Sequence, residues 1–548
     1  MSPSGKSSRS LANIAGIVAI ATLISKVFGL LREQIIAAAF GVGTVVTAYA
    51  YAYVIPGFLF ILLGGINGPF HSALVSVLAK RDREEAAPLV ETVTTLVSGV
   101  LLGVTIILVL GAGIFIDLLA PGLEPETRRM AVQQLQIMAP MALLSGLIGI
   151  GFGTLNAADQ YLLPSISPLL SSITVIVGLG AAVWQLGEQL NTEPYWLLGS
   201  LLLAGGTTAG AVLQWLAQIV PQAKAGMGKL RLRFNFALPG VKEVLQVMIP
   251  ATLSSGMLYI NFATNLFFAS FIPNAAAAMR YGNFVALTPL GIISNMILVP
   301  FLPVFSRLAD PQDWPELRLR IRQGIMLSAL TMFPLTAILV GLAIPIVQVI
   351  YERGAFDAEA AAEVAPVLAA YGLGMFFYLG RDVLVRVFYA LGDGNSPFKV
   401  SLFNIFLNGL LDFLFYKPFG TVGIVMATVG VNLFSMTIFI WMLNRRLAGL
   451  NLWRWAMDLG KLALITAIAS VAGWQGSILW EKIWGVDNLV ENTLEVFTMS
   501  SIILVVFAVG VAFAKVPEVD LLGDRLLKNS NGGSGDIFPG VMKEEFSF

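Results

Sequence analysis

Three charged residues interrupt a long apolar stretch near the start of the chain: Lys26, Arg32 and Glu33, inside the run LANIAGIVAIATLISKVFGLLREQIIAAAFG. Without them, about thirty residues would form one uninterrupted membrane helix. Charged side chains at membrane depth are unfavourable in lipid, and they usually face a cavity or a partner. The first span is therefore expected to line a path for something polar, which favours transport.

Helix geometry spreads these charges over a broad face. At 100° per residue, Lys26 and Glu33 lie on nearly the same line of the helix, while Arg32 lies about 120° away. Counting about 1.5 Å per residue from Leu11, Lys26 lies past the middle of the membrane, with Arg32 and Glu33 near its outer edge. A cavity wall fits this pattern; the alternative is that the span ends here and Arg32 reaches the interface.

Five further charged residues fall inside apolar stretches: Arg280, Arg381, Asp382, Arg386 and Asp412. Arg280 lies near the expected outer end of its span, so it could also reach the interface. Asp382 could pair locally with Arg386, four residues later. Asp412, in GLLDFLFY, could neutralise an arginine or bind a coupling cation. Basic groups outnumber acidic ones at this depth, which suits an anionic substrate because arginine binds phosphate bidentately.

Composition determines the elements that must position these side chains. The chain has 548 residues, of which 57% are hydrophobic and 12% charged, whereas a soluble domain carries roughly 25% charged residues. The first apolar run is too long for a signal peptide and is expected to be retained. An all-α polytopic membrane protein is predicted, with about fourteen spans near 11–39, 46–78, 88–119, 131–156, 162–185, 195–219, 240–270, 276–306, 322–349, 360–391, 396–416, 421–444, 455–480 and 491–516.

Two pairs of similar segments indicate a duplication. PFHSALVSVLA from Pro69 resembles PFLPVFSRLA from Pro300, and FGTLN from Phe152 resembles FYALG from Phe388. Similar offsets predict two six-helix lobes of the same orientation, related by an axis along the membrane normal. The expected organisation is an N-terminus (1–10), a first lobe (11–220), a basic linker (221–239), a second lobe (240–446), two further spans (455–516) and a tail (517–548).

The distribution of Lys and Arg predicts the orientation. Most of the chain's 33 Lys and Arg residues fall in alternate connecting segments that include the N-terminus, the linker and the tail. Basic loops stay in the cytoplasm, so both termini are expected to be cytoplasmic in a multi-pass plasma membrane protein.

Other classes of function lack the residues they need. The chain has no cysteine and a single histidine, His71, so a thiolate or histidine-rich metal site is not expected. No HExxH, GxSxG or Walker A motif is present, so no enzyme activity is expected. A net charge of zero and short basic loops give no support for nucleic-acid binding.

Three motifs resemble the MurJ (MviN) family, the lipid II flippases of the MOP exporter superfamily. They are SKVFGLLREQIIAAAFG in the first span, YERGAFD after the ninth, and VRVFYALGDGNSPFKVSL across the tenth and eleventh. The resemblance covers almost the whole chain. It implies two six-helix lobes around a central cavity, a lipid groove beside the last two spans, and alternating access that carries a lipid-linked peptidoglycan precursor to the outer leaflet of a bacterial inner membrane.

The resemblance also implies roles for the charged residues. Lys26 and Arg32 would hold the pyrophosphate of an undecaprenyl-linked glycopeptide, with Glu33 positioning them or accepting a coupling ion. Arg280, Arg381 and Arg386 would bind from the second lobe, and Asp412 is a second candidate for ion coupling. No cofactor is expected; membrane potential, H⁺ or Na⁺ are the candidate energy sources, and wall-synthesis enzymes are candidate partners.

The sequence departs from the family pattern at three places. VIPGFLFILLGG is wholly apolar where the family places an arginine, Phe284 stands at another arginine position, and Thr47 stands at an acidic one. The cargo therefore stays open between lipid II and another polyprenyl-linked glycan or a drug. A non-transporting scaffold for wall synthesis is a third alternative, in which the charged residues of the first span would be dispensable. The coupling ion, resting conformation, oligomeric state and role of the tail also stay open.

Overall fold

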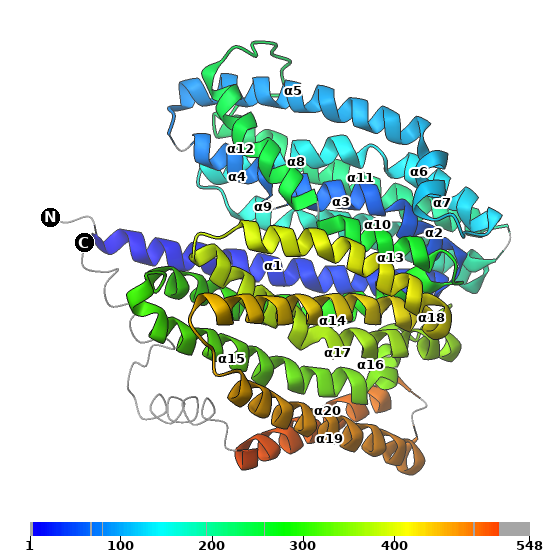
Figure 1. Ribbon diagram of the computed structural model, residues 1–548. Helices are drawn as coiled ribbons and strands as arrows, with labels where there is room; N and C mark the ends of the chain where they lie inside the picture. The colour runs from blue at the N-terminus through cyan, green and yellow to red at the C-terminus, as the bar shows by residue number, and fades with distance from the viewer. Residues whose placement is uncertain are drawn as a thin grey trace. The chain divides into compact units, whose positions relative to one another are not determined.

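The computed structural model describes residues 4–65, 68–78, 80–192, 194–256, 258–485 and 488–514. In these ranges every regular element is a helix, apart from one isolated bridge between Arg353 and Phe356. The predicted all-α class is therefore confirmed (Figure 1). The predicted tail at 517–548 lies outside the described residues.

The chain divides into two compact units. Unit 1 contains Met1–Ala277 and the short segment Tyr351–Ala360, and unit 2 contains Ala278–Ile350 and Ala361–Phe548. The helices up to the end of unit 1 are α1 (Ser4–Phe40), α2 (Thr44–Ala52), α3 (Val54–Gly64), α4 (Pro69–Leu78), α5 (Arg83–Leu110), α6 (Ala112–Leu119), α7 (Pro125–Met138), α8 (Met141–Ala157), α9 (Leu162–Ile166), α10 (Pro168–Leu186), α11 (Trp196–Lys224), α12 (Pro239–Gly256) and α13 (Leu258–Ala269). Those that follow are α14 (Ala275–Arg307), α15 (Trp314–Gly341), α16 (Ala343–Tyr351), α17 (Ala358–Ala390), α18 (Asn395–Arg446), α19 (Leu452–Trp484) and α20 (Leu489–Ala514).

Eleven helical stretches of the described residues are long and apolar enough to cross a membrane. Helix α18 is one of these eleven stretches. It contains a kink, because Gly420 has non-helical dihedral angles and lies two residues after Pro418. The predicted spans 396–416 and 421–444 lie on either side of this kink. The expected total of fourteen stays a prediction.

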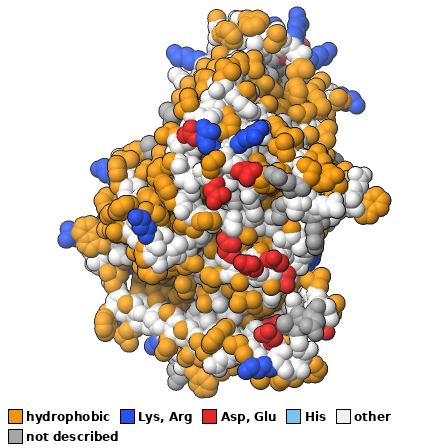
Figure 2. All heavy atoms as spheres, turned by 90° about the vertical axis from the view of Figure 1, so that its right-hand side faces the viewer, with side chains coloured by type: hydrophobic (Ala, Val, Ile, Leu, Met, Phe, Trp, Pro, Cys, Tyr) orange, Lys and Arg blue, Asp and Glu red, His pale blue; other side chains and the backbone are white. Residues whose placement is uncertain are grey.

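Apolar side chains cover the surface of the protein, as a lipid environment requires. Figure 2 shows hydrophobic side chains over most of the face turned to the viewer, with charged groups confined to limited areas. Leu110, Trp184 and Phe513 are each exposed by more than four-fifths. A soluble monomer rarely exposes contiguous apolar surface on this scale, whereas lipid tails accommodate it.

Helix α8 forms the centre of unit 1 and contacts α3, α4, α5 and α11. Almost all of its residues are buried. Gly149 allows a close approach of two backbones, because a Cβ atom there would collide with the backbone carbonyl of Leu63 in α3. Small residues bring membrane helices together in this way, so that dispersion contacts hold them.

The linker and the helix after it belong to unit 1. Helix α12 packs against α4, and Arg81 forms an ion pair of 3.0 Å with Glu243 of α12. The sequence places α12 and α13 in the second lobe, whereas the structure groups them compactly with the first. The predicted lobes, 11–220 and 240–446, describe an expected sequence repeat, whereas the two units describe which helices pack together. The lobe boundaries therefore stay a prediction.

Asp393 stabilises the turn between α17 and α18, the two helices that carry Arg381, Asp382, Arg386 and Asp412. Its carboxylate accepts hydrogen bonds from the backbone N–H and the hydroxyl of Ser396 at 3.0 and 2.8 Å, and pairs with Arg446 at 3.1 Å. Partial burial alone would raise the pKa of Asp393, but the bonds from Ser396 and the charge of Arg446 outweigh it and hold the pKa below its usual value.

Asp393→Ala is expected to destabilise the protein by about 1–2 kcal/mol, because a helix cap and an ion pair are lost together. A carboxyl whose pKa is lowered by folding stabilises the protein above its unfolded pKa and loses that effect as the pH falls. The gap between parent and variant in thermal unfolding in detergent should therefore persist at neutral pH and shrink below about pH 4. A gap that is unchanged at pH 3 would contradict this role.

Candidate functional site

The charged residues of the first span form an ion pair in unit 1. Arg32 donates from Nε and Nη2 to Oε1 of Glu33, at 3.2 and 2.8 Å. The Glu33 side chain is 2% exposed and that of Arg32 is 24% exposed. Neighbouring residues on a helix point in different directions, so the long arginine side chain must fold back to reach the buried carboxylate. Glu33 is thereby neutralised while the guanidinium keeps one accessible edge.

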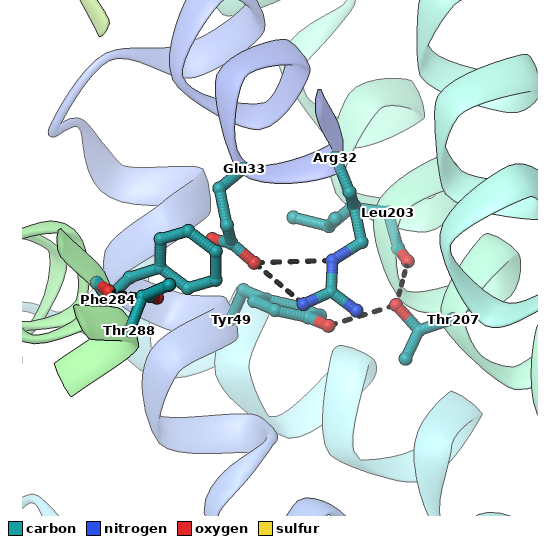
Figure 3. Close-up of polar contacts among 7 residues, drawn as sticks. All are labelled: Arg32, Glu33, Tyr49, Leu203, Thr207, Phe284 and Thr288. Atoms are coloured by element: carbon teal, nitrogen blue, oxygen red, sulfur yellow. Dashed lines mark hydrogen bonds and ion pairs between the residues drawn. The ribbon is translucent and has the colours of Figure 1, made fainter. Parts of the chain in front are cut away.

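Two hydroxyl groups lie close to this pair, and the sequence analysis did not single them out. Tyr49 of α2 and Thr207 of α11 form a hydrogen bond of 2.9 Å, and Thr207 also donates to the carbonyl of Leu203 at 2.8 Å. In Figure 3 the side chains of Arg32, Glu33, Tyr49 and Thr207 point toward one another. A lone hydroxyl on an apolar helix gives no signal in sequence, so only the packing of α2 against α11 reveals this polar group.

A second buried polar contact joins α11 to α7. Gln134 of α7 donates to the hydroxyl of Ser200 in α11 at 2.8 Å, and both side chains are buried. Buried hydrogen bonds of this kind fix the relative rotation of helices, because breaking one leaves a polar group in an apolar interior. This bond therefore helps to fix α7 against α11, the helix that carries Thr207.

Lys26, unlike Arg32 and Glu33, takes no part in this ion pair. Its side chain is exposed in unit 1 and makes no ion pair with any residue that the structure describes. Glu33 thus pairs with Arg32 and not with Lys26, which lies two helical turns earlier. Lys26 is available for an external anion.

Unit 2 contains the other candidate cations. Arg381 pairs with Asp382 at 2.7 Å, so the local partner of Asp382 is Arg381 and not Arg386. Arg386 is half-buried on the same helix, α17, and Arg280 is half-buried in the first turns of α14. The alternative pairing of Asp382 with Arg386 fails because the adjacent arginine folds back over the carboxylate, as Arg32 does over Glu33.

Asp412 is fully buried on α18 and lies on a polar line of that helix. Asn408 donates to its Oδ2 at 2.7 Å, and Asn404, one turn earlier, donates to Ser435 at 2.8 Å. The spacing of Asn404, Asn408 and Asp412 by four residues puts all three on one face. This spacing was visible in the sequence, although only Asp412 was singled out there.

The arrangement defines a membrane transporter: an all-helical polytopic protein with ionisable side chains buried among apolar helices. A multidrug transporter of the MATE family and the MOP superfamily has a similar fold, with a TM-score of 0.58 at 15% identity over 78% of this chain and 98% of that one. The family model described as lipid II flippase MurJ matches residues 36–495, beginning just after Glu33. The chain belongs to the MurJ family.

Individual relatives agree with this assignment. A probable lipid II flippase MurJ from Synechocystis is 96% identical over 528 residues, which cover 96% of this chain and 99% of the relative. A lipid II flippase MurJ from Burkholderia cenocepacia is 28% identical and covers 80% of this chain and 84% of its own length. A solved lipid II flippase MurJ in an inward closed conformation shares the fold, with a TM-score of 0.71 at 21% identity over 90% of this chain and 98% of that one.

Proposed function

We propose that this protein moves lipid II from the inner to the outer leaflet of the plasma membrane by alternating access, for cell-wall synthesis. The observation that carries the proposal is the Arg32–Glu33 pair, which places a half-buried guanidinium inside an apolar helix of a MurJ-family chain. In this proposal both termini are cytoplasmic.

The charged residues of both units would share the binding of the substrate headgroup. Glu33 holds Arg32 through Nε and Nη2, and the partly exposed guanidinium would bind a phosphate oxygen of the substrate. Lys26 adds a second, exposed charge less than two turns away from Arg32 on α1. Arg280, Arg381 and Arg386 would bind the headgroup from unit 2, while the undecaprenyl chain stays in lipid.

Energy for the cycle would come from an ion or from the membrane potential. Glu33 and Asp412 are the candidate ion-coupling residues, with H⁺ or Na⁺ as the ion. One charge moving across 100 mV supplies about 2.3 kcal/mol, enough to drive the return of a cationic cavity. The burial of Asp412 beside Asn408 supports a site for a small cation, because amide and carboxylate oxygens are its natural ligands.

Asp412→Asn is expected to lower ion-driven transport at least about ten-fold, because the charge that holds the cation is lost while the side-chain shape is kept. The measurement is lipid II movement in proteoliposomes under an imposed Na⁺ or H⁺ gradient. Glu316→Gln, at an exposed carboxylate of α15, is the matched control and should leave the rate unchanged. Equal gradient dependence in Asp412→Asn and the parent would exclude Asp412 from coupling.

Export of a different cargo is the alternative that a specific observation favours. Helix α3 carries no charged residue, and Phe284 of α14 stands where the resemblance places an arginine. Fewer basic groups would suit another polyprenyl-linked glycan or a drug.

Replacement of the essential flippase in a conditional bacterial strain tests the proposal. A copy of this chain that is expressed and correctly inserted is expected to sustain growth and wall synthesis. A well-inserted copy that fails to sustain wall synthesis would count against lipid II as the cargo and favour the alternative.

A further inference from the structure

The basic linker between α11 and α12 is a second place where charge and apolar surface meet, away from the residues discussed above. Residues 224–242 contain five basic side chains and no acidic one: Lys224, Lys229, Arg231, Arg233 and Lys242. From Lys229 to Phe236 the sequence KLRLRFNF alternates polar and apolar residues. Such a segment can present basic groups on one side and apolar groups on the other.

The linker is docked on helix α5 and does not form a loose loop. The backbone N–H of Lys229 donates to Glu91 at 3.2 Å, and that of Arg233 donates to the hydroxyl of Thr95 at 2.9 Å. The Arg233 side chain also pairs with Glu91, at 3.2 Å. These bonds fix the segment along the first turns of α5 (Figure 1).

The docking leaves the apolar side chains of the KLRLRFNF segment exposed. Leu230, Leu232 and Phe234 are 66%, 73% and 69% exposed. Helix α5 contributes the apolar stretch Glu84–Leu110, about 40 Å long and therefore longer than a hydrocarbon core of about 30 Å. The charged start of α5, which carries Glu84, Glu85 and Glu91, is therefore expected in the headgroup layer, where leucine and phenylalanine can enter the membrane beside basic groups.

A pocket lies where the linker joins α12. It has a volume of about 430 Å³ and is lined by Phe236, Val241, Lys242, Leu245, Gln246 and Ile249. Four of these residues, at positions 242, 245, 246 and 249, share one face of α12. The walls are mainly apolar, and Lys242 is the one charged lining residue.

The charge left over after pairing is positive. Arg233 is neutralised by Glu91, and Glu243 by Arg81. Within the part of the chain that the structure describes, Lys229, Arg231 and Lys242 are exposed and make no ion pair. An apolar pocket with Lys242 in its lining, next in the chain to a segment with further unpaired basic groups, matches an acyl chain joined to an anionic headgroup.

We propose that residues 229–249 bind an anionic glycerophospholipid, such as phosphatidylglycerol, at the end of the membrane where the linker lies. The acyl chain occupies the pocket against Phe236, Leu245 and Ile249. The phosphate is held by Lys242 and Arg231. This lipid anchors the linker and the start of α12 to the leaflet, and it is distinct from the transported cargo.

Photocrosslinking of the full-length protein in vesicles tests this proposal. The probe is phosphatidylglycerol with a diazirine in its acyl chain, compared with the same modification on phosphatidylcholine. The expected result is labelling of the peptide that contains residues 236–249 by phosphatidylglycerol, with much weaker labelling by phosphatidylcholine. Equal labelling by both lipids would overturn the proposal, because it would show ordinary surrounding lipid.

Two matched variants separate the site from general electrostatics. Arg231→Gln with Lys242→Gln is expected to lower the labelling about ten-fold or more, because two basic groups near the surface are removed. Arg307→Gln with Lys399→Gln removes one arginine and one lysine, both exposed, from other segments that are expected to be cytoplasmic. This control is expected to leave labelling unchanged; an equal loss in both double variants, or none in the first, would overturn the proposal.

Discussion

Arg32→Ala is expected to abolish growth support in a conditional flippase strain and to lower lipid II transport at least about a hundred-fold. The variant removes the arginine that pairs with Glu33, whose side chain is buried at 2% exposure. Breaking a buried ion pair on one side costs about 3–5 kcal/mol. The same change removes the guanidinium that would hold the pyrophosphate, so stability and transport should fall together.

A second variant separates these two effects. In Arg32→Ala with Glu33→Gln, no buried charge is left unpaired, so thermal stability in detergent should return close to that of the parent. Transport should stay abolished, because the phosphate ligand is still missing. A double variant that supports growth as well as the parent would show that Arg32 serves only to neutralise Glu33.

Gly354→Ala is expected to destabilise the protein by about 2–4 kcal/mol and to lower transport with it. Gly354 has φ of +57°, and a Cβ atom there would lie 2.5 Å from the carbonyl oxygen of Ala38. Beside it, the N–H of Ala355 donates to that same oxygen at 2.9 Å. Gly41 also has φ of +57°, and a Cβ atom there would collide with the carbonyl of Ala355. The segment Tyr351–Ala360 thus holds the end of α1, less than two turns after Glu33.

Two other glycines separate the backbone strain at positive φ from the steric contact of the added Cβ atom. Gly392 has φ of +72° with open space around it, so Gly392→Ala should show only the backbone strain, about 1–2 kcal/mol. Gly205, inside α11, has ordinary dihedral angles and open space, so Gly205→Ala should be neutral or slightly stabilising. Thermal unfolding of the three variants in detergent gives the order; a Gly354→Ala variant as stable as Gly205→Ala would contradict the close contact.

The class of fold could be predicted from the sequence because membrane spans are long apolar runs with a simple signal. The expected spans at 162–185 and 195–219 end within a few residues of α9–α10 and α11. The second span was harder to predict: it was expected at 46–78 as one piece, whereas the structure has three helices there, α2, α3 and α4. Breaks of this kind depend on neighbours that satisfy the freed backbone groups, and a single sequence does not show them.

The charged residues of the site were visible in the sequence, but their partners were not. Helical spacing placed Lys26 and Glu33 on one line, yet Glu33 pairs with the adjacent Arg32. Spacing describes where Cα–Cβ bonds point, whereas a long arginine side chain can fold back around the helix. Tyr49 and Thr207 were missed because helical spacing relates only residues of one helix, whereas their contact joins residues 158 positions apart.

The most direct test of the proposed function is lipid II translocation by the purified protein in proteoliposomes. Fluorescent lipid II is placed in one leaflet, and its arrival in the other leaflet is followed by quenching from outside. The parent protein is expected to move lipid II much faster than empty vesicles, and Arg32→Ala with Glu33→Gln is expected to match empty vesicles. A parent protein that moves no lipid II, or a double variant that moves it at the parent rate, would contradict the proposal.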